Sequence, residues 1–317
     1  MRRFVGIAIA VFGLFTWVRS AASQEVTRPA PERQSLDDAW WTGPMLAPSA
    51  STLPRGHILI ESYLYDVTAA HVNGFGSLTY MNYGLVDRVT VGLIPTAGFN
   101  AVNNGASSSG VGMGDLSVQA QYRLTKFRDD SWIPTTSVAV QEAIPTGKYD
   151  RLGERPSDGM GSGAYTTTLS FYSQTYFWLP NGRILRTRFN VSQALPNGVD
   201  VKDVSVYGTE AGFRGRAKPG KSLLVDSSWE YSLTRRWVLA FEGTYRHGAN
   251  TRVTGTNILD STNVRLDLGS NDAVGFAPAV EYSWKPNLGV LIGVRVVVLG
   301  HNTATTITPA VALNFVH

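Results

Sequence analysis

Ten charged residues lie on one face of segments in which apolar and polar side chains alternate. Their types and spacing make them the best candidates for a functional site. They are Glu61, Arg123, Arg186, Arg188, Asp226, Glu230, Glu242, Arg246, Glu281 and Arg295. Five are acids and five are bases, so strong selection of one sign of charge is not expected. The set is compatible with a salt-bridged belt that holds a structure together, and equally with a filter that lines a transport path.

Other kinds of chemistry fit the sequence poorly. The chain has no cysteine, which excludes disulfides, thiolate zinc sites and a cysteine nucleophile. His247, Ser270 and Asp272 are of the types found in hydrolases, but no nucleophile motif surrounds them. The glycines of 110–114 precede a strand pattern and no helix, so they do not form a nucleotide-binding loop. We therefore expect no enzyme, no cofactor and no metal site.

The segments that must position the ten residues are long and alternate between apolar and polar side chains. A strand that crosses a membrane at a tilt needs about 9–11 residues, whereas strands of soluble proteins have about 5–6. The pattern predicts an all-β, antiparallel transmembrane barrel of the bacterial outer membrane with about 12 strands. The expected strands are 56–67, 73–83, 88–100, 113–125, 131–145, 163–178, 183–195, 220–233, 236–248, 272–284, 288–300 and 303–315.

The connectors between these segments alternate in length, as outer-membrane barrels require. The short ones are 84–87, 126–130, 179–182, 234–235 and 285–287, and the long polar ones include 101–112, 146–162, 196–219 and 249–271. We expect the long connectors to face the outside of the cell. Four tryptophans adjoin the short turns and predict a girdle at the membrane interface. They are Trp132, Trp178, Trp237 and Trp284.

The N-terminus indicates export. Residues 1–23 combine a basic start, an apolar run and small residues at a cleavage site, which is typical of a secretory signal peptide. Without its three arginines the chain would be close to neutral, so nucleic-acid binding is not expected. Residues 24–55 form a proline-rich periplasmic lead-in, and the barrel would occupy 56–317. The Trp40-Trp41 pair is compatible with a plug in the lumen, a contact at the membrane surface or a tail with one packed contact.

Three short motifs resemble a known family. Gly112-Met113-Gly114-Asp115-Leu116 enters a strand, Pro145-Thr146-Gly147 leaves one, and Leu233-Thr234-Arg235-Arg236-Trp237 precedes Glu242. They are similar to the outer-membrane proteins of the meta-pathway of phenol degradation, over roughly 56–315. The resemblance implies a transporter of small aromatic or hydrophobic compounds in a Gram-negative bacterium.

The sequence as a whole predicts an outer-membrane channel for passive uptake or efflux of small molecules. Its partners would be the lipid bilayer, the small-molecule solute and the outer-membrane assembly machinery, which reads an aromatic residue at the end of the last strand. Here Phe315 fills that role, although Val316 and His317 follow it. The alternative is a structural or surface-interaction barrel with a closed lumen.

Overall fold

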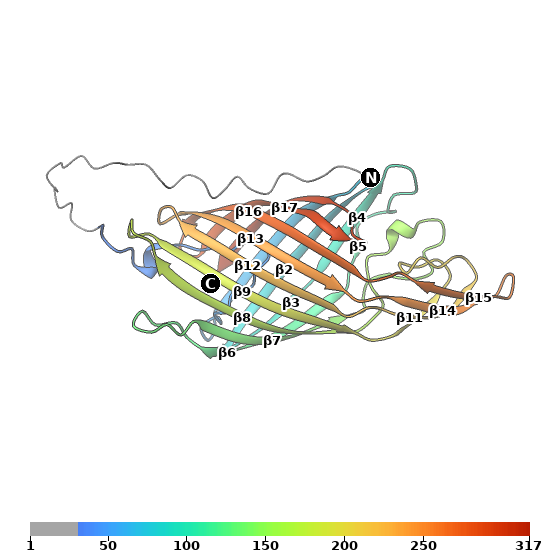
Figure 1. The fold of residues 1–317 in the computed structure, drawn as a ribbon, viewed down its shortest axis with the longest axis horizontal. Helices are drawn as coiled ribbons and strands as arrows, with labels where there is room; N and C mark the ends of the chain where they lie inside the picture. Colours follow the sequence, from blue (N-terminus) through green and yellow to red (C-terminus); the bar gives the residue numbers. More distant parts are fainter. Residues whose placement is uncertain (1–30) are drawn as a thin grey trace, which may run out of the picture. The chain divides into compact units, whose positions relative to one another are not determined.

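The computed structural model describes residues 31–317, so the predicted signal peptide lies outside the described residues. Twelve antiparallel strands form a closed barrel, and the predicted fold class and strand number are confirmed (Figure 1). The strands are β1 (Ile58–Thr68), β2 (Val72–Val86), β3 (Val89–Ile94) with its continuation β4 (Thr96–Val102), β6 (Leu116–Thr125), β7 (Thr135–Ile144), β8 (Thr166–Trp178), β9 (Ile184–Pro196), β12 (Ser222–Ser232), β13 (Trp237–Gly248), β16 (Asn271–Lys285), β17 (Leu288–His301) and β18 (Thr306–Val316).

The barrel closes where the first strand meets the last. β1 pairs with β2 on one side and with β18 on the other, with Leu59 opposite Val316. Closure gives the backbone N–H and C=O groups partners within the wall, which lipid cannot supply. The third strand is interrupted between β3 and β4 at Pro95, whose ring nitrogen has no hydrogen to donate to the ladder.

Alternation along each strand separates an apolar outside from a small or polar inside. On β13 the side chains of Trp237, Leu239 and Phe241 are exposed, whereas Val238 and Glu242 are buried. The outward side chains would face lipid, and charged groups there would be costly. On β16 and β18 many of the inward side chains are alanines. Because these side chains are small, they leave room inside the barrel for another segment.

Two of the predicted long loops contain strands that the sequence analysis missed. β10 (Val199–Lys202), β11 (Phe213–Lys218), β14 (Arg252–Asn257) and β15 (Thr262–Asp267) form a separate four-stranded sheet in that order. This sheet extends from one end of the barrel (Figure 1). Its buried face includes Phe213, Val201 and Val253, which are at most 1% exposed. The alternation was short and masked by Arg, Lys and Thr on the other face.

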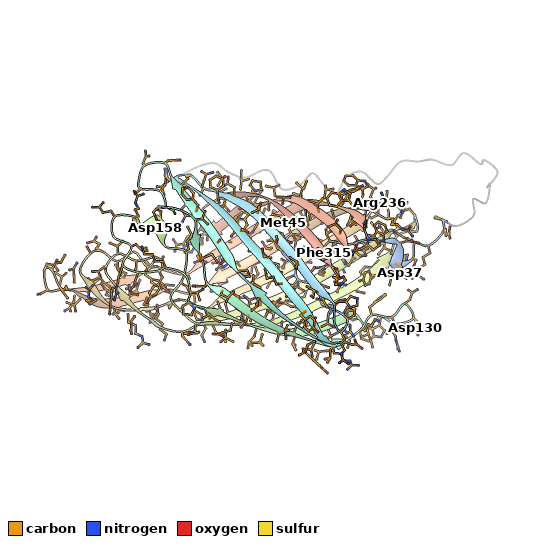
Figure 2. The ribbon with its side chains drawn as sticks, turned by 180° about the vertical axis from the view of Figure 1, so that it is seen from behind. Asp37, Met45, Asp130, Asp158, Arg236 and Phe315 are labelled. Atoms are coloured by element: carbon orange, nitrogen blue, oxygen red, sulfur yellow. The ribbon has the colours of Figure 1, made fainter. Side chains whose placement is uncertain are left out.

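The two ends of the barrel differ. Figure 2 shows Asp37, Asp130 and Arg236 at one end and Asp158 at the other. We call them the short-turn end and the long-loop end. The 3-10 helices η1 (Leu36–Asp38) and η2 (Pro156–Asp158) lie at these respective ends. In the described part of the chain, no helix has both the length and the apolar character needed to cross a membrane.

Candidate functional site: the lumen and its plug

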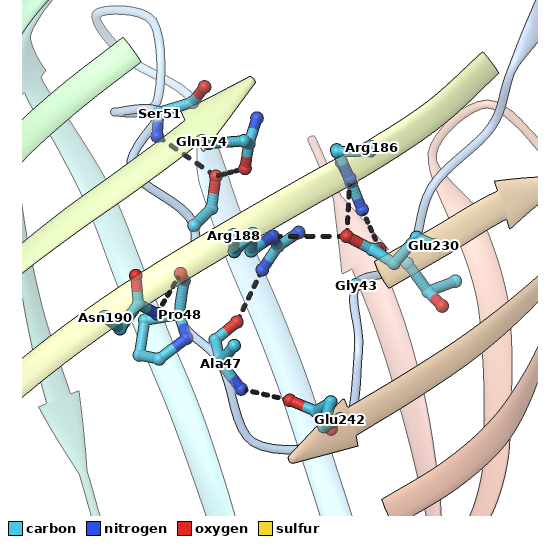
Figure 3. Close-up of polar contacts among 12 residues, drawn as sticks. Gly43, Ala47, Pro48, Ser51, Gln174, Arg186, Arg188, Asn190, Glu230 and Glu242 are labelled. Atoms are coloured by element: carbon cyan, nitrogen blue, oxygen red, sulfur yellow. Dashed lines mark hydrogen bonds and ion pairs between the residues drawn. The ribbon is translucent and has the colours of Figure 1, made fainter. Parts of the chain in front are cut away.

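Residues 33–55, which we call the plug, fold into the short-turn end of the barrel. The N–H of Gln34 donates to the carbonyl of Gly182 in one short turn, at 2.9 Å. The hydroxyl of Thr52 donates to the carbonyl of Asp87 in another, at 2.8 Å. Between these points Ala50 is fully buried. The segment therefore enters and leaves at the same end, and its middle reaches into the lumen (Figure 3).

Glu281 of β16 holds the ascending part of the plug. Its Oε2 accepts hydrogen bonds from the N–H groups of Thr42 and Gly43, at 2.8 and 3.1 Å, and from the Thr42 hydroxyl at 3.0 Å. The carboxylate is fully buried. Three donors therefore converge on one carboxylate oxygen. Glu281 thus anchors the plug through two backbone N–H groups and one side-chain hydroxyl.

Glu242 of β13 holds the apex of the plug in the same way. Its carboxylate accepts the N–H of Leu46 at 2.9 Å and that of Ala47 at 2.7 Å. Two strands away in the same part of the wall, Arg188 of β9 donates to the carbonyl of Ala47 at 2.5 Å. Figure 3 shows the contacts of Ala47 with Glu242 and with Arg188. An acid and a base on the two strands that flank β12 therefore bind the N–H and the carbonyl of one plug residue.

A buried ion-pair network lies beside these anchors. Nε of Arg186 donates to Glu230 at 2.7 Å, and Nε of Arg188 lies 3.3 Å from the same carboxylate. The guanidinium of Arg186 also stacks over the ring of Trp41, 4.3 Å from its centroid. A guanidinium over an aromatic face is attracted by the ring quadrupole. Of the three interpretations of the Trp40-Trp41 pair, the structure agrees with the plug in the lumen.

The structure places all ten predicted charged residues on the inner face by strand alternation. Arg186, Arg188, Glu230, Glu242 and Glu281 gather around the plug, and Glu61 accepts a hydrogen bond from Asn314. Arg123 lies toward the short-turn end of β6, whereas Asp226, Arg246 and Arg295 occupy positions nearer the long-loop end of their strands.

The sequence analysis missed the partners of Glu242 and Glu281. It considered a salt-bridged belt among the ten charged side chains, but these two acids are bonded by backbone N–H groups of the plug and by the hydroxyl of Thr42. One sequence signal was available. No charged residue occurs between Asp38 and Arg55, in a segment rich in proline, alanine and serine. Such a stretch is suited to burial in an extended form, with its backbone groups free to bond the wall.

A cavity of about 260 Å³ lies between the plug and the other half of the wall. Its wall residues are mainly neutral and polar. Gln121 of β6 donates to the carbonyl of Ser49 at 2.9 Å, and Ser49 donates to Gln174 at 3.1 Å. Tyr63 and Tyr80, in edge-to-face contact with 6.2 Å between ring centroids, line the same space. The charged anchors of the plug therefore lie on β9, β13 and β16, and neutral side chains of β6 and β8 hold it from beside a crevice that reaches β1 and β2.

The predicted tryptophan girdle needs one correction. Trp237 and Trp284 face outward next to short turns, each 45% exposed, and Trp132 is 89% exposed. Trp178 instead shares the inner face of β8 with Tyr172 and Gln174. Its Nε1 donates to the carbonyl of Gln34 at 2.8 Å, so it secures the entry of the plug. Its position beside a short turn could not reveal the face, because Trp178 is the last residue of its strand.

The residues considered for a hydrolase are only partly brought together. Nδ1 of His247 lies 2.8 Å from Oδ1 of Asp272, and the hydroxyl of Tyr245 donates to the same oxygen at 2.7 Å. Among residues 31–317, no hydrogen bond joins Ser270 to His247; the Ser270 carbonyl accepts one from Asn302.

Two of the sequence motifs meet at the long-loop end. The carboxylate of Asp115 accepts the N–H of Gly147 at 3.0 Å and that of Ser162 at 2.7 Å. The hydroxyl of Thr146 donates to the carbonyl of Gly114 at 3.1 Å. A side chain at Gly147 would clash, since an added Cβ would lie 2.7 Å from the backbone of residue 161. The motifs therefore pin the connector between β7 and β8 to the start of β6.

Comparison with known proteins agrees with this architecture. A family model described as "Putative MetA-pathway of phenol degradation" matches residues 43–313. An outer membrane channel from Pseudomonas putida F1 has a similar structure, with a TM-score of 0.65 and 13% identity over 86% of this chain and 100% of that chain. The toluene transporter TodX of Pseudomonas putida has a TM-score of 0.41 and 11% sequence identity, over 83% of this chain and 90% of that chain. No curated protein matches the sequence. The fold is that of bacterial outer-membrane barrels.

Proposed function

The chain belongs to the family of the MetA-pathway of phenol degradation, and on that premise we propose that it is an outer-membrane channel whose lumen is controlled by its own N-terminal plug. The observation that carries this proposal is the crevice of about 260 Å³ that the plug leaves in the lumen. The charged anchors of the plug lie on β9, β13 and β16. The crevice extends from the plug to β1 and β2. A barrel filled only for strength would need no such space.

The fold of the Pseudomonas putida channel supports a transport role over an enzymatic one. The family description favours small aromatic or hydrophobic solutes, which would cross passively. In this proposal the short-turn end faces the periplasm and the long-loop end faces the outside. Residues 1–23 would be removed on export, 24–55 would serve as the periplasmic lead-in that carries the plug, and 56–317 would form the barrel that the assembly machinery inserts.

The rival function is a structural barrel with a closed lumen, and the number of hydrogen bonds between plug and wall favours it. Single-channel recording and liposome swelling separate the two. The chain without residues 33–55 should conduct several times more current than the full chain, and the full chain should still show measurable conductance. A full chain that is silent, together with an open truncated barrel, would establish the closed structural role.

A barrel that lacks the plug must first be shown to fold. Boiled and unboiled samples should migrate differently on a gel, as expected for a stable closed barrel. A matched control removes loop residues 303–305, which connect β17 and β18 at the opposite end. That deletion leaves every plug contact in place, so conductance should remain at the level of the full chain.

A further inference from the structure

A row of three neutral amides crosses the wall of the crevice. Asn82 of β2, Gln119 of β6 and Gln141 of β7 line the cavity beside the plug. Asn82 and Gln119 both lie opposite Gly92 of β3, and Gln119 lies opposite Gln141. Residues directly opposite each other on neighbouring strands share a face, with their Cβ atoms about 4.5–5.5 Å apart. The three amides therefore follow one another across four consecutive strands.

Gly92 allows the first two amides to meet. Nε2 of Gln119 donates to Oδ1 of Asn82 at 2.7 Å, across the glycine that separates them. A Cβ added at Gly92 would clash with that same oxygen. The bond uses the oxygen of Asn82 and one N–H of Gln119. Within residues 31–317, no hydrogen bond engages the NH2 group of Asn82, the oxygen of Gln119 or the side-chain amide of Gln141. These groups are available to a solute.

Tyrosine rings supply the apolar surface of the crevice. Tyr63, Tyr80 and Tyr172 line it from β1, β2 and β8. A tyrosine presents an apolar ring and a polar tip, so flat apolar surfaces lie next to hydrogen-bonding groups. The volume of about 260 Å³ is just below the range of about 300–1,000 Å³ that pockets for drug-sized molecules have. The crevice therefore has room for a solute of roughly one ring.

The charges around the crevice are balanced. Among the described residues, the charged ones that line it are Glu61 and Arg188. Glu61 accepts a hydrogen bond from Asn314 at 3.3 Å. Arg188 donates to the plug and lies 3.3 Å from Glu230. One acid and one base, each with a protein partner, favour neither sign of ion. A charged solute would give up water here without gaining an unpaired charge of opposite sign.

We propose that the crevice selects small neutral rings that carry several hydroxyl groups, such as monosaccharides and cyclic polyols, over rings without them. The inference rests on the proposed channel function and revises only its solute class. A hydroxyl both donates and accepts, so it pairs with an amide oxygen and with an amide NH2 group alike. A hydrocarbon would cover the same amides and leave them without partners, and a site built for hydrogen bonds strongly rejects such an analogue.

Block of the single-channel current tests this preference. We expect myo-inositol to reduce the current of the full chain. Cyclohexanol has the same carbon ring with one hydroxyl, and it should need about tenfold higher concentration, equivalent to about 1.4 kcal/mol. Gln141→Met keeps the length of the side chain and should lower the affinity for inositol about tenfold. The matched control Gln193→Met changes a glutamine of β9 that strand alternation places outside the lumen, so block should be unchanged. Heat-modifiable mobility on gels shows that each variant folds.

A second measurement compares sugar rings of different charge. Liposomes that contain the channel should admit glucose several times faster than glucuronate or glucosamine. Equal block by inositol and cyclohexanol, an unchanged block in Gln141→Met, or an equal loss in Gln193→Met refutes the solute class alone. Faster entry of either charged sugar than of glucose refutes the preference for neutral solutes. A full chain that conducts no ion at all refutes the channel itself, and this inference with it.

Discussion

Removal of the Glu242 side chain should release the plug while the barrel stays closed. In Glu242→Ala the N–H groups of Leu46 and Ala47 lose their acceptor. A buried donor left without a partner costs about 1–3 kcal/mol. Water in the lumen can satisfy part of this need, so we expect a total of about 2 kcal/mol. That value corresponds to a rise of about 30-fold in the population with the plug undocked.

Cysteine labelling measures this population directly, because the chain has no cysteine of its own. Ala50 is fully buried in the docked plug, so Ala50→Cys should react with a polar maleimide only when the plug leaves. The labelling rate should rise about 30-fold when Glu242→Ala is added. Glu142→Ala is the matched control, since the carboxylate of Glu142 accepts a hydrogen bond from Thr167 and by strand alternation lies on the other face of β7 from Ala139, which packs with Ala50. Equal rates with and without Glu242→Ala would show that the carboxylate does not hold the plug.

Three further outcomes are expected. Phe213→Ala should cost about 3–5 kcal/mol in the four-stranded sheet, seen as faster proteolysis within 197–270 while the barrel remains heat-modifiable; intact loops would refute the assigned core. The hydrogen bond from Arg214 holds the pKa of Asp203 below its ordinary value, so its stabilisation is complete above about pH 4 and is lost as the pH falls through the lowered pKa. Proteolysis of the sheet should therefore increase in acid, and Asp203→Asn should flatten that dependence. Epitope tags within 203–212 should be labelled on intact cells, whereas labelling of tags within 126–130 would invert the topology.

The barrel strands could be predicted because each one carries its own signal. Alternation over a long segment depends only on one face meeting lipid and the other the lumen, so it survives without knowledge of any partner. β10 and β11 were missed because their short alternation lies in a polar connector, and their apolar face is buried against other loops. A local pattern of four to six residues does not distinguish such a sheet from an irregular loop.

The plug contacts could not be predicted for a different reason. Glu242 and Glu281 bind mainly backbone N–H groups, which every residue except proline possesses, so no charged side chain in the plug marks the partner. Strand alternation predicted that both acids face the lumen. It could not predict what fills the lumen, because that depends on where the N-terminal segment folds. Trp178 shows the same limit, because a residue at the very end of a strand can belong to the girdle or to the lumen.

Only Gly56 and His57 separate the plug from the first residue of β1. The plug is therefore a tethered ligand whose effective concentration at its own site is in the millimolar range or above, as for other short linkers. Because it enters and leaves at one end, it can dissociate and rebind without breaking the wall. A free peptide that copies residues 33–55 would have to reach a comparable concentration to compete, so affinity measured on the isolated peptide would greatly understate how fully the lumen is occupied.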